Sequence, residues 1–300
     1  MNARAARATA RVEAQAKLNL FLRVGPREPS GYHELETLFQ RISLADTVTV
    51  RTGVPGRTLD CRGADAGPME SNLAWRAALA FSAACGWPDC FAIEIQKRIP
   101  VGGGLGGGSA DAAAVLRALN AIAPRTLKAE ALSLLALGLG ADVPYLVSEL
   151  PLALGRGRGE RLFGFDPLPP RDVILLIPPF GVSSAGAFAA WDTAHTAPSP
   201  APPALLTSQS HLDWNTVAKC AANDLEEPVF AQHPEIAALQ RALAKAGAQI
   251  AHMTGSGSTA FGLFEPGTAL AQSLGIDART LGVTMIRATT VERVAAVELI

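Results

Sequence analysis

The stretch Pro100-Val-Gly-Gly-Gly-Leu-Gly-Gly-Gly-Ser-Ala-Asp111 is the most informative part of this 300-residue sequence, because six of the seven positions from 102 to 108 are glycine. Glycine loses more backbone entropy on folding than any other residue, so such a run is costly unless the chain needs positive φ angles or close approach of a ligand. A strand pattern precedes the run and an alanine-rich helix pattern follows it. Loop amides and the positive end of the helix would then converge on one point, which favours a bound phosphate.

Other interpretations of the glycine run are weaker. A flexible linker normally has polar flanks, whereas these flanks are apolar. Residues 102–107 formally satisfy GxGxxG, but a run this rich in glycine produces that pattern almost automatically. The acidic residue that should end a strand about 20 residues later is missing, since Glu130 begins a helix pattern. A Walker A loop is absent, because Gly107 is followed by Gly108 and not by lysine.

Two neighbouring features leave alternatives open. Ser109, at the start of the expected helix, could cap that helix, ligate Mg²⁺, or do both. A second glycine cluster, Thr254-Gly-Ser-Gly-Ser-Thr259, could be a simple hairpin turn. It could equally form a second wall of the cleft that the first loop begins.

Hydrophobic periodicity predicts a mixture of strands and helices along the chain. Strands are expected at residues 12–23, 44–51, 91–99, 173–177, 249–253, 260–264 and 283–288, and helices at 72–84, 109–121, 129–139 and 236–246. This mixture predicts an α+β fold, and 300 residues suggest about two domains, at 1–167 and 168–300. Residues 197–203 include four prolines and are expected to form an exposed loop.

Composition restricts the possible partners of the chain. Its net charge is −1, so general nucleic-acid binding is disfavoured for lack of a basic surplus. The longest uncharged run, residues 173–191, contains Pro178 and Pro179, and no membrane span is predicted. The sequence leaves open whether the protein is a monomer or a homodimer.

The cysteines and the N-terminal residues indicate in which cellular compartment the protein is expected. Four cysteines without a CxxC pair are typical of reduced thiols in the cytoplasm, and small apolar core positions are favoured over a metal half-site at Cys85 and Cys90. Arg4, Arg7 and Arg11 precede any acidic residue, as in an organelle-targeting peptide. A short, frayed, unprocessed extension is favoured, because the segment is brief and lacks serine.

Lys17 is the candidate for a catalytic cation. Only five of the 26 cationic residues are lysine, and this one lies within an apolar strand pattern, on the same face as Asn19. A half-buried lysine needs a carboxylate partner, and Asp142, in the Gly-Ala-Asp-Val-Pro segment 140–144, is the candidate. The alternative is an ion pair with a purely structural role.

Tyr32 and His33 follow the turn after the first predicted strand. An aromatic ring beside an imidazole could hold a flat heterocycle by stacking and hydrogen bonding. An ordinary loop histidine is the alternative.

Taken together, five segments resemble the GHMP kinase superfamily: residues 16–19 (Ala-Lys-Leu-Asn), 31–33 (Gly-Tyr-His), 100–109, 140–144 and 254–257. They occur in order over most of the chain. The resemblance implies an N-terminal ATP-binding domain with a ribosomal protein S5 domain 2-like fold and a ferredoxin-like C-terminal domain. It implies a kinase that uses ATP with Mg²⁺. The acceptor it implies is the 2-hydroxyl of a methylerythritol that carries a cytidine diphosphate group, in the non-mevalonate route to isoprenoid precursors.

The same resemblance assigns roles to individual residues. Asp142 would be the catalytic carboxylate and Lys17 its partner, while Asn19, Tyr32, His33 and Phe188 would bind the acceptor. The ATP-binding residues would be Lys97, Pro100, Val101, Gly102, Gly103, Gly104, Leu105, Gly106, Gly107, Gly108 and Ser109, with Ser109 also a candidate Mg²⁺ ligand. Thr254, Gly255, Ser256 and Gly257 would form the second glycine loop.

Competing functions make different predictions. A nicotinamide- or flavin-dependent oxidoreductase would bind a dinucleotide tightly and consume no ATP. A regulatory nucleotide-binding protein would bind ATP and be indifferent to loss of the Asp142 carboxylate. A homoserine or mevalonate kinase would need no cytidine group on the acceptor.

Overall fold

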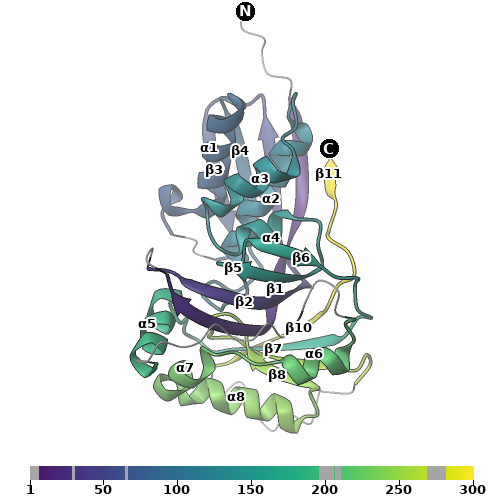
Figure 1. Ribbon diagram of the computed structural model, residues 1–300. Coiled ribbons are helices and arrows are strands. Elements are labelled where there is room, and N and C mark those ends of the chain that lie inside the picture. The colour runs from purple at the N-terminus through teal and green to yellow at the C-terminus, as the bar shows by residue number, and fades with distance from the viewer. Residues whose placement is uncertain (1–6, 29–30, 65–66, 196–205, 207–210, 269–281) are drawn as a thin grey trace, which may run out of the picture.

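The computed structural model describes residues 7–28, 31–64, 67–195, 206, 211–268 and 282–300, and Figure 1 draws the rest as a grey trace. The proline-rich segment 197–203 and Arg4 lie outside the described residues. The chain folds around two antiparallel-rich sheets with helices on them, so the predicted α+β mixture is confirmed.

The first sheet is built on two long paired strands, β1 (Ala8–Arg27) and β2 (His33–Thr52). The second half of β2 pairs with β4 (Phe91–Gln96), and its first half pairs with β5 (Leu152–Gly157). The short strands β3 (Arg57–Arg62), β6 (Arg161–Gly164) and β11 (Val297–Leu299) complete seven strands, with the path β11-β1-β2-β4-β3 and β5–β6 branching from β2. Because β1 starts at Ala8 and includes Arg11, the expected frayed extension is wrong for this part of the N-terminus.

Helices cover this sheet: α1 (Leu73–Cys85), α2 (Gly107–Ile122), α3 (Ala129–Leu137) and the short α4 (Val143–Val147), with a 3₁₀ turn, η1, at Met69–Ser71. Asn72 caps α1, its side chain accepting a hydrogen bond from the Ala74 amide at 2.9 Å. Every residue of α2 from Ala110 to Leu119 is buried, since alanine side chains allow the neighbouring elements to approach closely.

The second sheet contains β7 (Asp172–Ile177), β8 (Ile250–Met253), β9 (Ala260–Phe264) and β10 (Thr284–Thr289). All its pairs are antiparallel and its order is β10-β7-β9-β8. In chain order this is 4-1-3-2, the strand arrangement of a ferredoxin-like sheet. Helices α5 (Ser184–Ala194), α6 (Trp214–Cys220), α7 (Glu226–Gln232) and α8 (Pro234–Lys245) connect β7 to β8.

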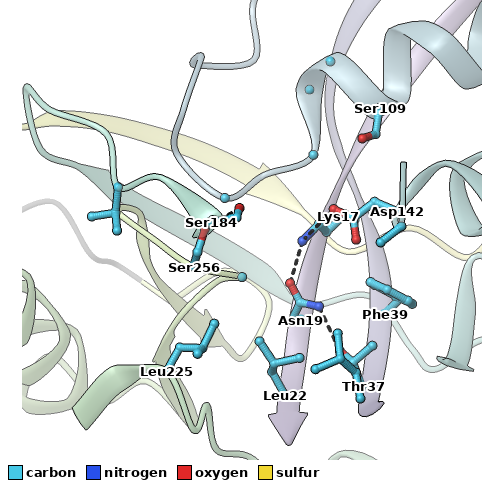
Figure 2. Close-up of a pocket in the computed structure, with 18 of the residues that line it drawn as sticks. Lys17, Asn19, Leu22, Thr37, Phe39, Ser109, Asp142, Ser184, Leu225 and Ser256 are labelled. Atoms are coloured by element: carbon cyan, nitrogen blue, oxygen red, sulfur yellow. Dashed lines mark hydrogen bonds and ion pairs between the residues drawn. The ribbon is translucent and has the colours of Figure 1, made fainter. Parts of the chain in front are cut away.

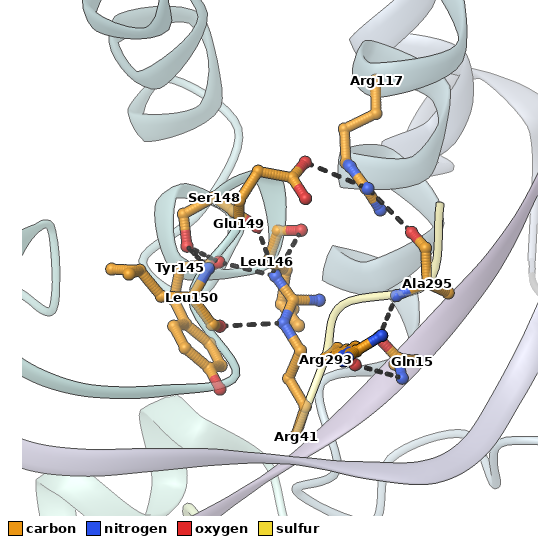
Figure 3. Close-up of polar contacts among 10 residues, drawn as sticks. All are labelled: Gln15, Arg41, Arg117, Tyr145, Leu146, Ser148, Glu149, Leu150, Arg293 and Ala295. Atoms are coloured by element: carbon orange, nitrogen blue, oxygen red, sulfur yellow. Dashed lines mark hydrogen bonds and ion pairs between the residues drawn. The ribbon is translucent and has the colours of Figure 1, made fainter. Parts of the chain in front are cut away.

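The end of the chain returns to the first sheet, where β11 pairs with β1 (Figure 1). The backbone carbonyl of Ala295 accepts a hydrogen bond from Arg117 of α2 at 2.8 Å, and the Ala295 amide donates to Gln15 at 2.9 Å (Figure 3). The boundary proposed at residues 167/168 therefore separates the two sheets except for this last strand. It stays a prediction as a boundary between domains.

The structure confirms each predicted strand and helix in type, with shifted ends. The strand expected at 12–23 extends over 20 residues, and the one at 44–51 is only the second half of β2. Four short strands, β3, β5, β6 and β11, and helices α4 to α7 were not predicted. No helix among the described residues is both long and apolar enough to cross a membrane.

Candidate active site

A cavity of about 430 Å³ lies where the two glycine-rich segments, the strands β1 and β2 and the start of α5 come together (Figure 2). Its wall contains glycines of the 102–108 run, Gly255 and Ser256 of the second cluster, and the side chains of Lys17, Asn19 and Asp142. Segments far apart in the sequence therefore contribute to one hollow, and most of the predicted site residues lie on it.

The first glycine loop adopts a conformation that only glycine tolerates well. Gly102, Gly104 and Gly106 have φ angles of 76°, 77° and 74°. A Cβ atom on Gly104 would lie 2.1 Å from the carbonyl oxygen of Thr254, so the two loops could not approach as they do if a side chain were present.

The second cluster is both a hairpin turn and a wall of the cavity, so the two interpretations left open by the sequence hold together. It joins the paired strands β8 and β9, and the Gly257 amide donates to the Thr254 carbonyl at 3.0 Å. The Thr259 amide also donates to the Gly103 carbonyl of the first loop at 3.3 Å.

Lys17 is buried and meets the carboxylate anticipated for it. Its Nζ lies 3.3 Å from Oδ2 of Asp142 and donates to Oδ1 of Asn19 at 2.6 Å. Asn19 in turn donates from Nδ2 to the Thr37 hydroxyl at 2.8 Å (Figure 2). The side chain of Asp142 is 30% exposed, so its carboxylate is available to a ligand in the cavity.

Asp142 directly precedes α4, and a buried arginine holds the other end of that helix (Figure 3). Arg41, only 2% exposed, donates from Nη2 to the carbonyls of Tyr145, Leu146 and Ser148 at 2.9–3.0 Å. Burial lowers the pKa of Arg41, the expected effect of removing a cation from water. A cation at the C-terminal carbonyls stabilises the helix, and so fixes the segment that carries Asp142. Sequence reasoning missed Arg41, because arginine is the common cation of this chain and Gln40 beside it breaks the apolar pattern.

Ser109 is not a helix cap, so this one of the alternatives left open by the sequence is wrong. Helix α2 starts at Gly107, and its cap position is Gly106, a residue without a capping side chain. The positive φ of Gly106 turns the loop directly into the helix. Ser109 lies in the first turn, and its hydroxyl is on the cavity wall near Asp142 (Figure 2).

Lys97 lies beneath the glycine run in a buried cluster of charges. Its Nζ is 2.5 Å from Asp46 and 2.7 Å from Asp111 of α2. Burial raises the pKa of Asp111 to about 7, with Lys97 opposing and Asp46 adding to the rise. For Lys97 burial favours the neutral amine, but attraction to Asp111 and Asp46 outweighs it and the pKa is raised. Lys97 also borders a second cavity of about 200 Å³, formed with residues 100–108, and its part in ATP binding stays a prediction.

The aromatic end of the site is only partly as predicted. His33 is buried, with Nδ1 3.0 Å from the Gly25 carbonyl and Nε2 3.0 Å from Asp192. Its ring stacks on Phe188, with centroids 5.6 Å apart and planes 10° from parallel, and Phe188 lines the cavity. Tyr32 does not join them: it is 60% exposed, with the Arg158 guanidinium 4.1 Å from its ring centroid.

Comparison with known proteins identifies the family. The model of the GHMP kinases N terminal domain matches residues 72–149, and that of GHMP kinases C terminal matches residues 204–274. A 4-diphosphocytidyl-2-C-methyl-D-erythritol kinase of Pelotomaculum thermopropionicum is 41% identical over 83% of this chain and 87% of that protein. The chain belongs to the GHMP kinase family. A second relative of the same name, from Anaeromyxobacter dehalogenans strain 2CP-C, is 42% identical over 93% of this chain and 90% of that protein.

Solved structures agree with membership of the GHMP kinase family. A crystal structure of 4-(cytidine 5'-diphospho)-2C-methyl-D-erythritol kinase matches with a TM-score of 0.74 at 35% identity, over 93% of this chain and 98% of that one. Homoserine kinase from Cytophaga hutchinsonii matches with a TM-score of 0.70 at 15% identity, over 98% and 97%, and shares the fold. The two-domain GHMP kinase fold and the ATP-dependent kinase expected from the sequence are confirmed, and the oxidoreductase alternative is set aside.

Proposed function

We propose that this protein transfers the γ-phosphoryl group of ATP to the 2-hydroxyl of 4-diphosphocytidyl-2-C-methyl-D-erythritol, giving the 2-phosphate and ADP. The reaction belongs to the methylerythritol phosphate pathway to isoprenoid precursors. The observation that carries this function is that relatives of about 40% identity, aligned over most of the chain, bear the name of this kinase. The convergence of Lys17, Asn19 and Asp142 at the glycine loop supports it.

ATP would bind with its phosphates over the first glycine loop. The amides of residues 102–109 and the N-terminal end of the 16-residue helix α2 offer hydrogen-bond donors and a positive dipole end to an anion. Gly255 and Ser256 face the same cavity from the second loop. The closeness of the two loops supports a shared role in enclosing the triphosphate.

Mg²⁺ fits this site as an ion held mainly by the nucleotide. Among the described residues no group of three or more His, Cys, Asp or Glu side chains could hold a metal. Mg²⁺ commonly uses few protein ligands and binds through substrate phosphates, and the Ser109 hydroxyl on the cavity wall is a suitable oxygen ligand. Bound Mg²⁺ would supply charge neutralisation to the phosphates.

Asp142 would orient the acceptor hydroxyl and accept its proton late in the transfer. Phosphoryl transfer passes through a loose transition state, so positioning contributes more than strong base chemistry. The Lys17 ammonium, 3.3 Å away, holds the carboxylate in place and adds positive charge near the reacting oxygens. Asn19, anchored by Thr37, would fix the acceptor beside them.

The aromatic end would bind the cytosine. We assign its hydrogen bonding to His33 and its stacking to Phe188 and Tyr32, although Tyr32 would have to move from its exposed position. A cytoplasmic location and a monomeric or homodimeric state stay predictions.

An acceptor panel tests this function. The purified protein is supplied with Mg-ATP and, in separate reactions, with 4-diphosphocytidyl-2-C-methyl-D-erythritol, mevalonate or homoserine. ADP release and product mass are measured. We expect phosphorylation of the diphosphocytidyl compound alone, whereas turnover of either small alcohol in its place would refute the assignment.

A further inference from the structure

Strand β2 runs along the cavity, from the aromatic end at Phe188 to the end at Lys17 and Asp142, which is called the reacting end. Leu35, Thr37 and Phe39 line the cavity at alternate positions, and His33 comes two residues before them. Alternate residues of a strand share a face and are spaced by about 7 Å. Thr37 holds Asn19, and Phe39 lies 5.9 Å from the Lys17 ammonium, so these two mark the reacting end. Leu35 is therefore the midpoint between the expected base site and the reacting hydroxyl.

The β5–β6 hairpin places Arg158 at that midpoint. Gly157, at the end of β5, pairs with Leu35 of β2, and Arg158 follows it. The Arg158 amide donates to the Glu160 carboxylate at 2.6 Å. Gly157 has a φ of 74°, and a Cβ there would lie 2.6 Å from the same carboxylate. The Glu160 carboxylate thus closes the turn, and Arg158 lines the cavity.

The cavity wall carries two cationic side chains, and one of them lies between the two ends of the cavity. Of the described residues that line the cavity, only Lys17 and Arg158 are cationic. Lys17 is engaged with Asp142 and Asn19 at the reacting end. The acceptor proposed above carries a diphosphate between its cytidine and its erythritol, and that group brings two negative charges to the middle of the cavity.

The ion pair of Arg158 with Glu28 can be exchanged for another at low cost. Its Nη2 lies 3.0 Å from Glu28, and both side chains are 37% exposed. Such half-exposed ion pairs contribute little to stability. The central carbon of the Arg158 guanidinium also lies 4.1 Å from the centroid of the exposed Tyr32 ring, a cation–π contact. A planar guanidinium offers paired N–H donors that match phosphate oxygens, which the ammonium of a lysine does not.

We infer that the Arg158 guanidinium binds the diphosphate of the acceptor and so selects nucleoside-diphosphate-linked alcohols over free alcohols; the inference rests on the proposed function. Arg158 is on this account a specificity residue at the middle of the cavity. It takes no part in the transfer at Lys17 and Asp142.

Calorimetric titration with CDP and with cytidine tests this inference. The proteins compared are the unaltered chain, Arg158→Met, Arg158→Lys and the control Arg161→Met. Arg161 follows three residues later and pairs with Glu34 at 3.1 Å, but does not line the cavity. We expect Arg158→Met to weaken CDP binding about 10- to 100-fold and cytidine binding less than about threefold, because charged hydrogen bonds to the diphosphate are lost. The CDP affinity of Arg158→Lys should lie between those of Arg158→Met and the unaltered protein, and the CDP affinity of Arg161→Met should equal that of the unaltered protein.

The outcomes separate this inference from the function beneath it. Equal weakening of CDP and cytidine, or no weakening by Arg158→Met while the unaltered protein binds CDP, would overturn the role of Arg158 and leave the proposed function standing. If the unaltered protein bound neither CDP nor cytidine, the cytidine-based function would fail and the inference with it.

Discussion

The Lys17 ammonium lies 3.3 Å from the Asp142 carboxylate, although Lys17 comes from the first strand and Asp142 from the segment before α4. The first glycine loop holds Lys17 in this position. The Lys17 amide donates to the Leu105 carbonyl at 3.1 Å, and Gly106 passes so close to the Lys17 stem that a Cβ would lie 3.1 Å from Cγ. The loop proposed to bind the phosphates of ATP thus also positions the Lys17 ammonium beside Asp142.

Asp142→Asn should lower kcat about 10²- to 10⁴-fold, because the amide cannot accept the proton of the acceptor hydroxyl. The melting temperature should change little, since the Asp142 side chain is partly exposed and its ion pair is not fully desolvated. Steady-state kinetics and thermal unfolding measure both effects. Asp60→Asn, which removes an exposed partner of Arg62 away from the cavity, is the matched control. Full turnover by Asp142→Asn would remove Asp142 from the reaction.

Gly106→Val should abolish ATP binding. The φ of 74° is unfavourable for valine, and its side chain would press on Lys17 and fill the phosphate cradle. Gly86→Val is the control for backbone strain alone: Gly86, at the end of α1, has a φ of 64°, and a Cβ there would have no neighbour within 4 Å. Nucleotide affinity measured by fluorescence titration should fall for Gly106→Val only. Equal loss in both variants would assign the effect to strain.

His33→Ala should raise KM for the acceptor at least tenfold and leave KM for ATP within about twofold, because a base-edge hydrogen bond is lost far from the nucleotide. Phe188, stacked on His33, loses a neighbour as well, so some loss of acceptor stacking is included in this effect. Initial rates with each substrate varied in turn provide the measurement. A fall in ATP affinity would instead contradict the assignment of His33 to the cytosine.

The buried cluster of Lys97, Asp46 and Asp111 should make stability depend on pH. Burial raises the pKa of Asp111 to about 7, above the unfolded value near 3.8, so the folded state holds its proton more tightly. Stability from this group is present below about pH 4 and is lost as pH rises toward 7. The free energy of unfolding of Asp111→Asn minus that of the unaltered protein should therefore be more positive at pH 8 than at pH 5, by on the order of 1–4 kcal/mol. Urea denaturation at both pH values tests this, and a difference that stayed constant or moved the other way would contradict it.

The parts of the site that the sequence predicted share a local signal. Six glycines between a strand pattern and a helix pattern restrict what the backbone can do, so the loop was recognisable without its neighbours. Lys17 stood out because lysine is rare in this chain and this one interrupts an apolar strand. Its contact with Asp142 required the fold, because nothing in the spacing of the two residues brings them together.

The parts that were missed lack such a signal. Arginine is the common cation of this sequence, so Arg41 and Arg158 carried no mark of their buried or cavity-lining positions. The return of β11 to β1 depends on three residues whose partners lie at the opposite end of the chain. The helix-cap alternative for Ser109 was wrong because a glycine with positive φ can begin a helix without a capping side chain.

A crystal structure of the protein with a non-hydrolysable ATP analogue and Mg²⁺ tests the central claim most directly. The account predicts triphosphate density against the amides of residues 102–109, with the γ-phosphate directed toward Lys17 and Asp142. Density for the nucleotide elsewhere, with this loop empty, would contradict it.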